Sequence, residues 1–570
     1  MTQTITKRWQ IAPHVPEPVQ QALIEFPPLL RQLLFNRGIT DAESARSYIL
    51  GEPLGDTNPL LMSGMPAAVD TLHQAVQSQS PIAIYGDYDV DGVTASALLY
   101  EFLQKLGLEA RVYIPNRFDE GYGVNLEAIQ TLADEGIKLI ITVDCGIRST
   151  QEIALANNLG MGVIITDHHL PGDILPEALA VVNPHQEGDV YPYKYLAGVG
   201  LAYKLAQAYL QVFPVEGVSA DDWLDLVALG TVADVAPLTG ENRFLVRKGL
   251  QLMRSVNRQG LFSLCKVAGV NMERLTASHI GFWIAPRLNA AGRMDSAVAA
   301  FDLLTSRDLF TAGTLAQQLH QQNSQRKEVT AQIQSYALAA AQELSSDNLV
   351  IFVSSPDFNE GVVGLAAGRV VDAVYKPTII GHQSEESTKA SCRSILEFNI
   401  HDALEQCRDL LERFGGHAMA AGLTIRNENQ AAFIERINQI AKSQLAGLDL
   451  RPSLNIDREI FLDKLEPAHI PGIMEDVSLL EPTGCENPSA LFCSRDVEVV
   501  NWRTVGSDGQ HLKLTLKSGS HTFDAIAFGM GYWAGKLPDT IDIVYTFDEN
   551  EFNGRTILQL RIEDIQPSSG

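Results

Sequence analysis

The sequence predicts an α/β protein built from several domains. Between residues 81 and 167, short apolar runs alternate with helical patterns, and this alternation is typical of a parallel, doubly wound sheet. Residues 310–345 form a long helical pattern without glycine or proline after Gly313. Beyond about residue 455, apolar and polar residues alternate between turn signals, which indicates a small antiparallel β-barrel, with an OB-fold as one candidate.

The first sheet is expected to contain four strands, with a helical stretch between each strand and the next. The strands are PIAIYG (81–86), EARVYIPN (109–116), KLIITVD (138–144) and GVIITD (162–167). The helical stretches between them are 93–107, 125–136 and 149–160, and residues 197–250 also have a helical pattern. A second α/β pattern follows the long helix, with strands at 348–355 and 377–381 around a helix at 361–374.

Five regions follow from these patterns. They are an N-terminal helical extension (1–75), a first α/β domain with a helical segment (76–310), a connecting helix (311–347), a second α/β domain (348–445) and an OB-fold-like barrel (455–570). The barrel strands are expected at 494–505, 509–519, 521–529 and within 540–566.

Composition excludes several classes of protein. The chain is 45% apolar, has no apolar run long enough to span a bilayer, and begins without the apolar segment of a signal peptide. Its six cysteines form no CxxC frame, so we expect a reducing cytoplasm. We also expect a monomer with no membrane partner. The net charge of −26 argues mildly against nucleic acid and equally for polyvalent cations.

Acidic and imidazole side chains follow three of the predicted strands. They are Asp87, Asp89 and Asp91 after the first strand, Asp144 after the third, and Asp167, His168 and His169 after the fourth. A further acid, Asp234, follows a helical stretch. Because ligands of open α/β sheets gather at the carboxyl ends of strands, we expect these side chains to meet at one edge.

This set of side chains predicts a binuclear metal centre. Mixed oxygen and imidazole ligands suit Mn²⁺, Zn²⁺ or Fe²⁺, whereas an all-oxygen site suits Mg²⁺. Five or six ligands exceed the need of one ion, and two ions roughly 3.5–4 Å apart would use them with one carboxylate as a bridge. A single aspartate after a strand is more often a helix N-cap, and Asp91 could be one. Because acidic or imidazole side chains follow three separate strands, the N-cap explanation is weaker for the whole set than for a single aspartate.

The same residues resemble a known family. The motifs DYDVDG (87–92), VDCG (143–146), DHH (167–169) and GTVADVAPL (230–238), in this order, resemble those of the DHH phosphoesterase superfamily. RSILEFNIHDAL (393–404) and FGGHAMAAGLTI (414–425) resemble its second domain, which carries a GGH motif. IAPRLNAAGRM (284–294) and LEPTGCENPSALF (480–492) narrow the resemblance to the RecJ family of single-strand-specific 5′→3′ exonucleases.

The resemblance implies roles for individual residues, with two Mn²⁺ or Mg²⁺ ions as cofactors. Asp144 would bridge the ions, Asp89 with Asp87 would complete one site, and Asp91, His168 and Asp234 would complete the other. His169 would contact the scissile phosphate or act as a general acid, and Asp167 would orient a histidine. Many superfamily members have a histidine where this chain has Tyr85, so Asp87 is the candidate to replace it. Many RecJ proteins also have a histidine at the position of Asn359.

Substrate-facing residues are expected outside the metal ligands. Ser391, Arg393 and His417 offer a hydroxyl, a guanidinium fork and an imidazole beside the GGH glycines. Arg117 and Tyr122 lie in a glycine-rich segment, where they could meet a phosphate and stack on a base. Arg287, Asn289 and Arg293 suit a passing nucleic-acid backbone, although the arginines could equally bridge helices. A barrel would lengthen a groove for a single strand, but its aromatic residues, such as Trp502 and Phe523, could simply be core.

These observations predict a metal-dependent exonuclease that hydrolyses single-stranded DNA from the 5′ end to 5′-mononucleotides. The ions and Arg393 would stabilise the developing charge, and His169 would help the 3′-oxygen leave. The resemblance implies DNA repair and recombination, with single-strand-binding protein and a helicase as partners. One alternative is a DHH phosphodiesterase for short oligonucleotides or cyclic dinucleotides, which would not need the barrel. Another is a binding protein that has lost catalysis, but such relatives usually lose ligands, and none is missing here.

Overall fold

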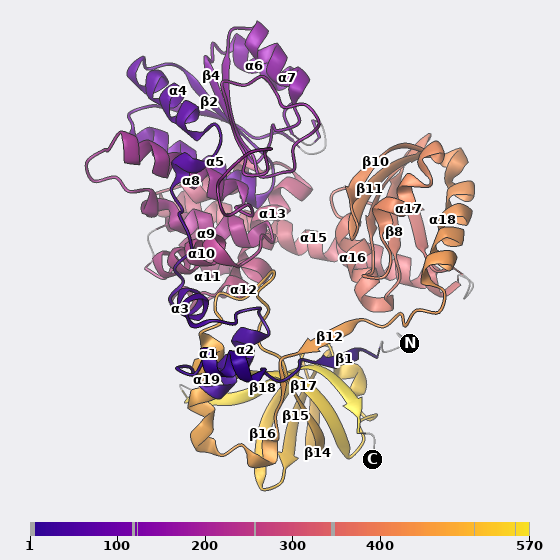
Figure 1. Ribbon diagram of the computed structural model, residues 1–570. Helices are drawn as coiled ribbons and strands as arrows, with labels where there is room; N and C mark the ends of the chain where they lie inside the picture. The colour runs from indigo at the N-terminus through magenta and orange to yellow at the C-terminus, as the bar shows by residue number, and fades with distance from the viewer. Residues whose placement is uncertain are drawn as a thin grey trace.

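A computed structural model describes residues 6–116, 120–121, 123–255, 258–343, 348–506, 508–552 and 555–568. It has three bodies, shown in Figure 1 as a sheet domain at the top, a second α/β domain at the right and a barrel at the bottom. Helix α15 (Leu309–Glu343) joins the first two bodies, so the connecting helix predicted from the sequence is confirmed.

The first sheet is parallel, with strand order β3-β2-β4-β5-β6. The strands are β2 (Ile82–Gly86), β3 (Ala110–Tyr113), β4 (Leu139–Val143), β5 (Gly162–Thr166) and β6 (Ala180–Val182). The first four were expected, whereas β6 is too short to give a sequence signal. The central strands are buried on both faces, which explains their nearly continuous apolar runs.

Helices cover both faces of this sheet. Alternate side chains of β2 divide accordingly: Ile82 and Ile84 belong to one core, and Ala83 and Tyr85 to the other. The first core is shared with α4 (Met65–Gln77), α5 (Val90–Lys105) and α8 (Gly198–Val212), and the second with α6 (Leu126–Asp134) and α7 (Thr150–Asn158). Helix α5 begins at Val90, three residues earlier than expected.

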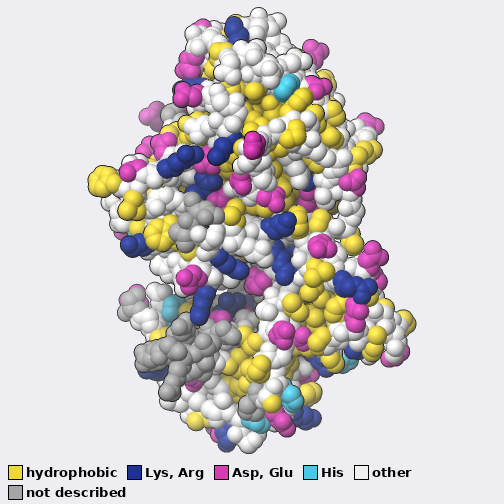
Figure 2. Space-filling view, turned by 90° about the vertical axis from the view of Figure 1, so that its left-hand side faces the viewer, with side chains coloured by type: hydrophobic (Ala, Val, Ile, Leu, Met, Phe, Trp, Pro, Cys, Tyr) yellow, Lys and Arg dark blue, Asp and Glu magenta, His cyan; other side chains and the backbone are white. Residues whose placement is uncertain are grey.

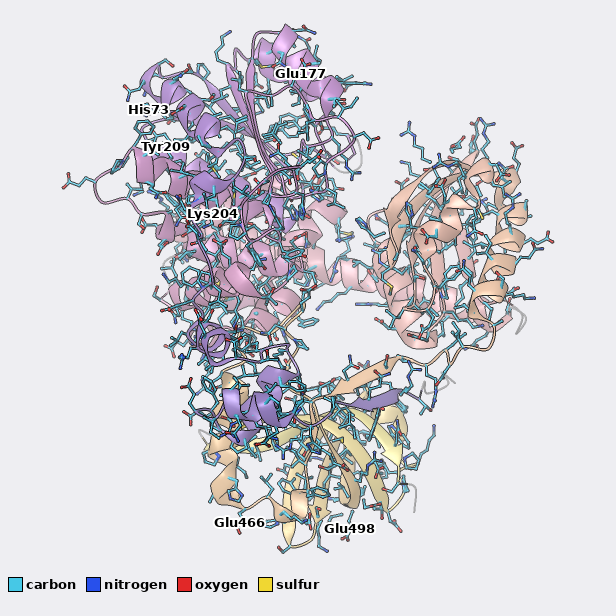
Figure 3. The ribbon with its side chains drawn as sticks, viewed as in Figure 1. His73, Glu177, Lys204, Tyr209, Glu466 and Glu498 are labelled. Carbon is cyan, nitrogen blue, oxygen red and sulfur yellow. The ribbon has the colours of Figure 1, made fainter. Side chains whose placement is uncertain are left out.

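A helical layer extends the first domain below the sheet. It contains α9 (Leu224–Ala233), α10 (Gly240–Met253), α11 (Gln259–Ala268), α12 (Ala277–His279), the π-helical turn η4 (Ile280–Ile284), α13 (Ala285–Met294) and α14 (Val298–Thr305). The buried Lys204 of α8 forms an ion pair with Glu241 of α10, which ties this layer to the sheet domain. Figure 3 also shows His73 and Tyr209 facing one another from α4 and α8, where the imidazole Nδ1 lies 3.2 Å from the phenol oxygen.

The second α/β domain has a mixed sheet of order β10-β11-β9-β8-β7. Its elements are β7 (Ile351–Ser355), α16 (Val363–Val374), β8 (Thr378–Gln383), β9 (Ser387–Arg393), α17 (Ile400–Glu405), β10 (Leu411–His417), β11 (Ala420–Arg426) and α18 (Gln430–Leu445). Only β7 and β8 run parallel, and these are the two strands that the sequence predicted. The GGH motif ends β10.

The C-terminal barrel is closed, because β14 pairs with both β15 and β17. Its strands are β14 (Phe492–Val505), β15 (His511–Ser518), β16 (His521–Ala527), β17 (Thr540–Phe552) and β18 (Arg555–Pro567). All neighbouring pairs are antiparallel except β16 and β18, which run parallel. Phe523 belongs to the barrel core, whereas Trp502 is 41% exposed.

The N-terminal segment lies beside the barrel (Figure 1). It is mostly helical, with α1 (Glu17–Ala22), α2 (Pro28–Phe35) and α3 (Ala42–Leu50), but it begins with an unexpected strand, β1 (Arg8–Ile11). This strand pairs in parallel with β12 (Ser453–Ile456), a contact between distant parts of the chain that local pattern does not reveal. Leu33 of α2 completes the barrel core, and helix α19 (Ile470–Ser478) packs against α2.

Charge is unevenly distributed over the surface. Although the net charge is −26, Lys and Arg side chains gather across the middle of the face in Figure 2. All six cysteines are free thiols. Within the described part of the chain, we find no helix with the length and apolar character needed to cross a membrane.

Candidate metal centre

The fold brings the predicted acids and histidines to one edge of the first sheet. Strands β2, β4 and β5 are neighbours and parallel, so their carboxyl ends meet. Three groups of potential ligand atoms lie there, each with all its atoms within 4.8 Å of one another. The groups are Asp87 with Asp89 and Asp144, Asp91 with His168 and Asp234, and Asp144 with His168 and His169. Asp144 and His168 each belong to two groups.

Asp144 occupies a constrained position at the end of β4. Its backbone has a φ of 62°, in the left-handed region that residues other than glycine rarely adopt. The Asp144 amide donates to the carbonyl of Thr166 on β5, which fixes this turn. Strained backbone of this kind is common where a side chain must be aimed at a functional site.

Asp91 is held by the start of a helix distant in sequence. Its two carboxylate oxygens accept hydrogen bonds from the amides of Gly198 (2.6 Å) and Val199 (2.8 Å), at the N-terminus of α8. Such amides are unsatisfied at the start of a helix and favour a negative charge. The expectation that Asp91 could be the cap of its own helix is wrong, because Asp89 has that role: its Oδ1 accepts from the amides of Asp91 (2.8 Å) and Gly92 (3.1 Å).

Two glycines make room for these carboxylates, and sequence reasoning missed both. A Cβ atom at Gly198 would lie 2.6 Å from the Cβ of Asp144. A Cβ atom at Gly230 would lie 2.2 Å from Thr94 Oγ1 and 2.9 Å from Asp91 Oδ1. The sequence patterns around these glycines are AGVG at 197–200 and GTVAD, which begins at Gly230. Neither pattern alone reveals that the glycine lies against a carboxylate.

The central pair of ligand atoms lacks hydrogen bonds. Nε2 of His168 and Oδ1 of Asp144 lie 3.0 Å apart, and both atoms are buried without a hydrogen-bond partner. Nε2 also lies 3.8 Å from Asp91 Oδ2 and 4.0 Å from Asp234 Oδ2. Buried polar atoms are normally satisfied, so this arrangement of carboxylates around an imidazole nitrogen fits a divalent cation.

The electrostatics of the metal-free cluster agree with this fit. Burial, with repulsion from neighbouring carboxylates, raises the pKa of Asp91 to about 7 and that of Asp234 to about 9. Burial raises the pKa of Asp144 well above its usual range as well. Burial lowers the pKa of His168 to about 4, which keeps its imidazole neutral and able to coordinate. Bound cations would replace the protons that this crowding otherwise favours.

His169 and Asp167 form a separate pair beside the cluster. Asp167 Oδ1 lies 2.8 Å from Nδ1 of His169 and also accepts from the His169 amide, while Oδ2 accepts from the amide of Ile147. Burial lowers the pKa of His169, but the hydrogen bond and the charge of Asp167 outweigh it, so the net pKa is raised. Because Nδ1 faces Asp167, this histidine is positioned by a carboxylate.

The GGH motif of the second domain faces this pair across a cavity. The cavity has a volume of about 830 Å³ and is lined by residues of the first domain, including Arg148 and His169, and by Gly416 and His417 of β10. Strand register places His417 opposite Ala420 and Ala420 opposite Arg393, so these residues share one end of the sheet. A Cβ atom at Gly364 of α16 would meet Arg393 Nη2 at 3.2 Å and Ser391 Oγ at 3.3 Å, which places both side chains at the start of that helix.

The remaining predicted residues differ in their surroundings. Arg287 is 5% exposed and bonds to the Trp283 carbonyl and to Nδ1 of His320, so it bridges α13 and α15, as the sequence allowed. Arg293 donates to the carbonyl of Gly361 in the second domain. Asn289, half-buried, precedes Arg293 by one helical turn. Arg117 and Tyr122 lie outside the described residues.

The two residues that depart from the family pattern, Tyr85 and Asn359, have defined surroundings in the structure. The Tyr85 ring lies in the core on the far face of the sheet, where it stacks on Tyr113 and its hydroxyl accepts from Asn125. It therefore takes no part in the cluster, whereas Asp87, 2% exposed, does. Asn359 accepts a hydrogen bond from the amide of Gly361, shortly before α16.

Fold and site together define a DHH-type phosphoesterase. Residues 81–231 match the DHH family N-terminal domain, residues 346–443 match the DHHA1 domain, and residues 456–564 match the RecJ OB domain. The chain is 39% identical to the single-stranded-DNA-specific exonuclease RecJ of Bacillus subtilis over 98% of its own length and 71% of the relative's. It is 36% identical to RecJ of Escherichia coli over 95% and 96% of the two chains. The chain belongs to the RecJ family.

Solved structures agree with this assignment. The crystal structure of Thermus thermophilus RecJ in complex with Mn²⁺ superposes with a TM-score of 0.83 at 29% identity, over 99% of this chain and 80% of that one. The Mg²⁺ complex of the same protein gives a TM-score of 0.77 at 27% identity, over 99% and 79% of the two chains.

Proposed function

We propose that the protein is a metal-dependent exonuclease that hydrolyses single-stranded DNA. The observation that carries this proposal is the cluster in which Asp144 and His168 each belong to two of the three ligand groups. The RecJ relatives are named as single-stranded-DNA-specific exonucleases, and one of them binds Mn²⁺ and Mg²⁺ in crystals. The barrel adds a surface of the kind that commonly holds single strands.

The residues present fit two Mn²⁺ or Mg²⁺ ions. Asp87, Asp89 and Asp144 would hold one ion, and Asp91, His168, Asp234 and Asp144 would hold the other, with Asp144 between them. When bound, such ions stabilise the charge of the phosphoryl transition state and make a water molecule a better nucleophile. The neutral imidazole of His168 favours Mn²⁺, because Mg²⁺ prefers oxygen ligands alone.

The protein groups around the cluster have distinct tasks. The α8 amides orient Asp91 and oppose the rise in its pKa, since they donate directly to both of its oxygens. His169, with its raised pKa, would contact the scissile phosphate and donate a proton to the departing 3′-oxygen. Asp167 is a positioning residue that holds Nδ1 of this imidazole and leaves Nε2 to face the substrate. We therefore prefer His169 as an acid over His169 as a metal ligand.

The second domain is proposed to recognise the 5′ end. Ser391 and Arg393 share one strand and the start of α16, while His417 shares their end of the sheet and lines the cavity beside His169. A guanidinium and a hydroxyl in this place suit a terminal phosphate. Binding of that phosphate would close one side of the site, so that only a free 5′ terminus reaches the metal ligands and 5′-mononucleotides are released.

The alternative of a phosphodiesterase for short oligonucleotides or cyclic dinucleotides is less well supported. The same cluster would serve it, but such an enzyme has no use for the closed barrel, which packs against the N-terminal helices. Activity on long single strands compared with dinucleotides separates the two functions. A binding protein without catalysis is disfavoured by the complete ligand set.

The cellular setting is part of the proposal. We expect the enzyme to act as a monomer in the cytoplasm, in DNA repair and recombination. Single-strand-binding protein and a helicase are the expected partners, because one holds and the other generates its substrate.

A digestion assay tests the function directly. We expect end-labelled linear single strands to be shortened from the 5′ end to mononucleotides with Mn²⁺ or Mg²⁺, and duplex and circular single strands to resist. Arg393→Gln should weaken discrimination between 5′-phosphate and 5′-hydroxyl ends. Cutting of the circle at a rate comparable with the linear strand would refute the closed 5′ pocket, and loss of all activity on long strands would favour the alternative.

A further inference from the structure

A buried asparagine lies next to the loop that carries His169. Asn183 follows β6, the edge strand of the first sheet, and none of its surface is exposed. Strand β6 pairs in parallel with β5, whose carboxyl end leads into the loop with His169. At the start of this loop the Asp167 amide donates to the carbonyl of Val182, so the ends of the two strands are joined. No role was expected for Asn183 from sequence patterns.

Both ends of the Asn183 side-chain amide form hydrogen bonds. Nδ2 donates to the backbone carbonyl of His169 (2.8 Å), and Oδ1 accepts from the amide of His185 (2.7 Å). A carbonyl only accepts and a backbone amide only donates, so these partners fix which end of the side chain faces which loop. The bond to His185 closes a turn within the Asn-Pro-His segment, as asparagine side chains often do. The bond to His169 reaches a different loop.

Hydrogen bonds are needed to hold His169, because packing holds it only in part. Its side chain is 43% exposed. Oδ1 of Asp167 bonds to its Nδ1 and to its backbone amide, while Asn183 bonds to its backbone carbonyl. The carbonyl of the next residue, Leu170, accepts from Nε of Arg148 (2.8 Å). The peptide groups on both sides of the His169 Cα are therefore fixed, and the ring extends from a fixed backbone.

The place of this ring matters for the proposed reaction. A water oxygen bonds to phosphorus and its proton passes to solvent, while the bond from phosphorus to the 3′-oxygen breaks. The electron pair of that bond stays on the 3′-oxygen, which takes the proton from Nε2 of His169 and leaves as a hydroxyl. Solvent then returns a proton to the imidazole. Such a transfer requires hydrogen-bond reach, and a misplacement of roughly 1 Å can lower a rate by about 10²-fold.

An asparagine elsewhere in the chain shows what a purely structural role looks like. Asn438 of α18 is 6% exposed in the second domain. Its Oδ1 accepts from the amides of Leu349 and Val350, and its Nδ2 donates to the carbonyl of Ile434. The two asparagines thus have partners of the same kind, but Asn183, unlike Asn438, bonds to a residue beside the metal ligands.

We propose that Asn183 is a positioning residue for the hydrolysis: its bond to the His169 carbonyl holds the imidazole where it can protonate the departing 3′-oxygen. This inference rests on the proposed nuclease function and on His169 as its general acid. Because Asn183 is fully buried, it can act on the substrate only through the residues that it holds.

Kinetics of the full chain with Mn²⁺ test this proposal. Asn183→Ser removes the donor to the His169 carbonyl, while its hydroxyl can still accept from the His185 amide and keep the turn. Asn438→Ser removes a bond of the same kind in the second domain and is the matched control. Asn183→Ser would also be combined with His169→Gln. Asn183→Thr, which keeps the acceptor and fills more of the site, takes the place of Asn183→Ser if that variant does not fold.

The expected results separate positioning from general stability. On linear single-stranded DNA, Asn183→Ser should lose about 10–100-fold in kcat, with little change in KM or in Mn²⁺ affinity. Asn438→Ser should keep the kcat of the unmodified protein even if its unfolding temperature falls. In the His169→Gln background, Asn183→Ser should cause no further loss, because the two residues act as a unit. A full additional loss in that background, or equal losses in Asn183→Ser and Asn438→Ser, would overturn the proposal.

A modified leaving group supplies a second readout that general destabilisation would not move. In an oligonucleotide whose first 3′-bridging oxygen is replaced by sulfur, the leaving group is a thiolate, which departs without a proton. We expect Asn183→Ser and His169→Gln to approach the rate of the unmodified protein on this substrate. A loss as large as that on ordinary DNA would show that Asn183 does not act through proton donation.

The same assays distinguish this proposal from the proposed function. If the unmodified protein does not digest single strands with Mn²⁺ at all, the proposed function itself fails. Digestion by the unmodified protein, together with an unchanged kcat in a folded Asn183→Ser protein, means that only the positioning proposal fails.

Discussion

The imidazole of His168 and the carboxylate of Asp144 face each other at 3.0 Å between Nε2 and Oδ1, and neither buried atom makes a hydrogen bond. The two residues come from the ends of adjacent parallel strands, β5 and β4. Two unpartnered buried acceptors at this separation are costly without a cation, and each of them belongs to two ligand groups. Four testable predictions follow from the surroundings of this pair.

The first prediction concerns the shared carboxylate. Asp144→Asn keeps the size of the side chain but removes the charge common to two ligand groups. We expect nuclease activity to fall by several orders of magnitude, since both ions would lose a ligand. The metal-free variant should be at least as stable as the unmodified protein, because repulsion from Asp91, Asp89 and Asp87 is relieved. Nuclease assays and thermal unfolding in EDTA measure both effects, and near-normal turnover by a folded variant would contradict the two-ion site.

The second prediction concerns pH and the metal-free protein. Burial raises the pKa of Asp91 to about 7 and that of Asp234 to about 9 in the folded state, both above the usual 3.8. The folded protein therefore binds more protons than the unfolded chain between pH 3.8 and about pH 9. The free energy of unfolding decreases as pH rises across this range. Urea unfolding in EDTA at pH 5 to about 9 should show this decrease, less steeply in Asp234→Asn. A saturating divalent ion should reverse the trend, because binding requires the ionised carboxylates.

The third prediction separates two adjacent histidines. His168→Gln should weaken Mn²⁺ binding, whereas His169→Gln should bind Mn²⁺ normally and lose about 10²–10⁴-fold in kcat, as expected for a missing general acid. Asp167→Asn should keep the fold but lower the pKa of His169, since its hydrogen bond and charge raise that pKa. The alkaline limb of the kcat profile should then move to lower pH. Calorimetry of Mn²⁺ binding is the decisive readout: weakened binding in His169→Gln would make this residue a ligand.

The sequence alone predicted much of this arrangement, because the carboxyl ends of neighbouring parallel strands meet at one edge of the sheet. The four parallel strands, the connecting helix and the barrel each produce a regular local pattern of apolar residues in the sequence. Strands β1 and β6 do not, since β1 depends on a partner far away in the chain and β6 is very short. The pairing of β1 with β12, for example, joins residues 8–11 to residues 453–456. Three seven-residue strands of the second domain, β9, β10 and β11, were also not predicted, although β8 with β9 and β10 with β11 are antiparallel pairs of consecutive strands.

At the site, the sequence revealed the types of metal-ligating residue, but it did not reveal the backbone groups that hold these residues in place. The motif order placed Asp87, Asp144 and His168 together, and the structure brings them within reach of shared ions. That Asp89 rather than Asp91 is the N-cap depends on where α5 begins, which the pattern misplaced by three residues. The amide pair that holds Asp91 lies more than a hundred residues away, and nothing in the sequence near either partner signals it.

The last prediction concerns Gly198, one of the two residues whose amides hold Asp91. At Gly198, the first residue of α8, an added Cβ would lie 2.6 Å from Asp144 Cβ and 2.8 Å from its Oδ1, so either the carboxylate or the helix must shift. Gly198→Ala should therefore weaken Mn²⁺ binding by about 10–100-fold, a range typical of groups that orient metal ligands, and should lower activity accordingly. Gly200→Ala, in the same turn, is the matched control, because its Cβ would meet only Leu196 at 3.4 Å. Both changes add one methyl group to the same helix, so a general effect on α8 would appear in both. Mn²⁺ titration and circular dichroism of the two variants decide the question: equal affinities in two folded proteins would show that the close approach of Gly198 to Asp144 does not govern the metal centre.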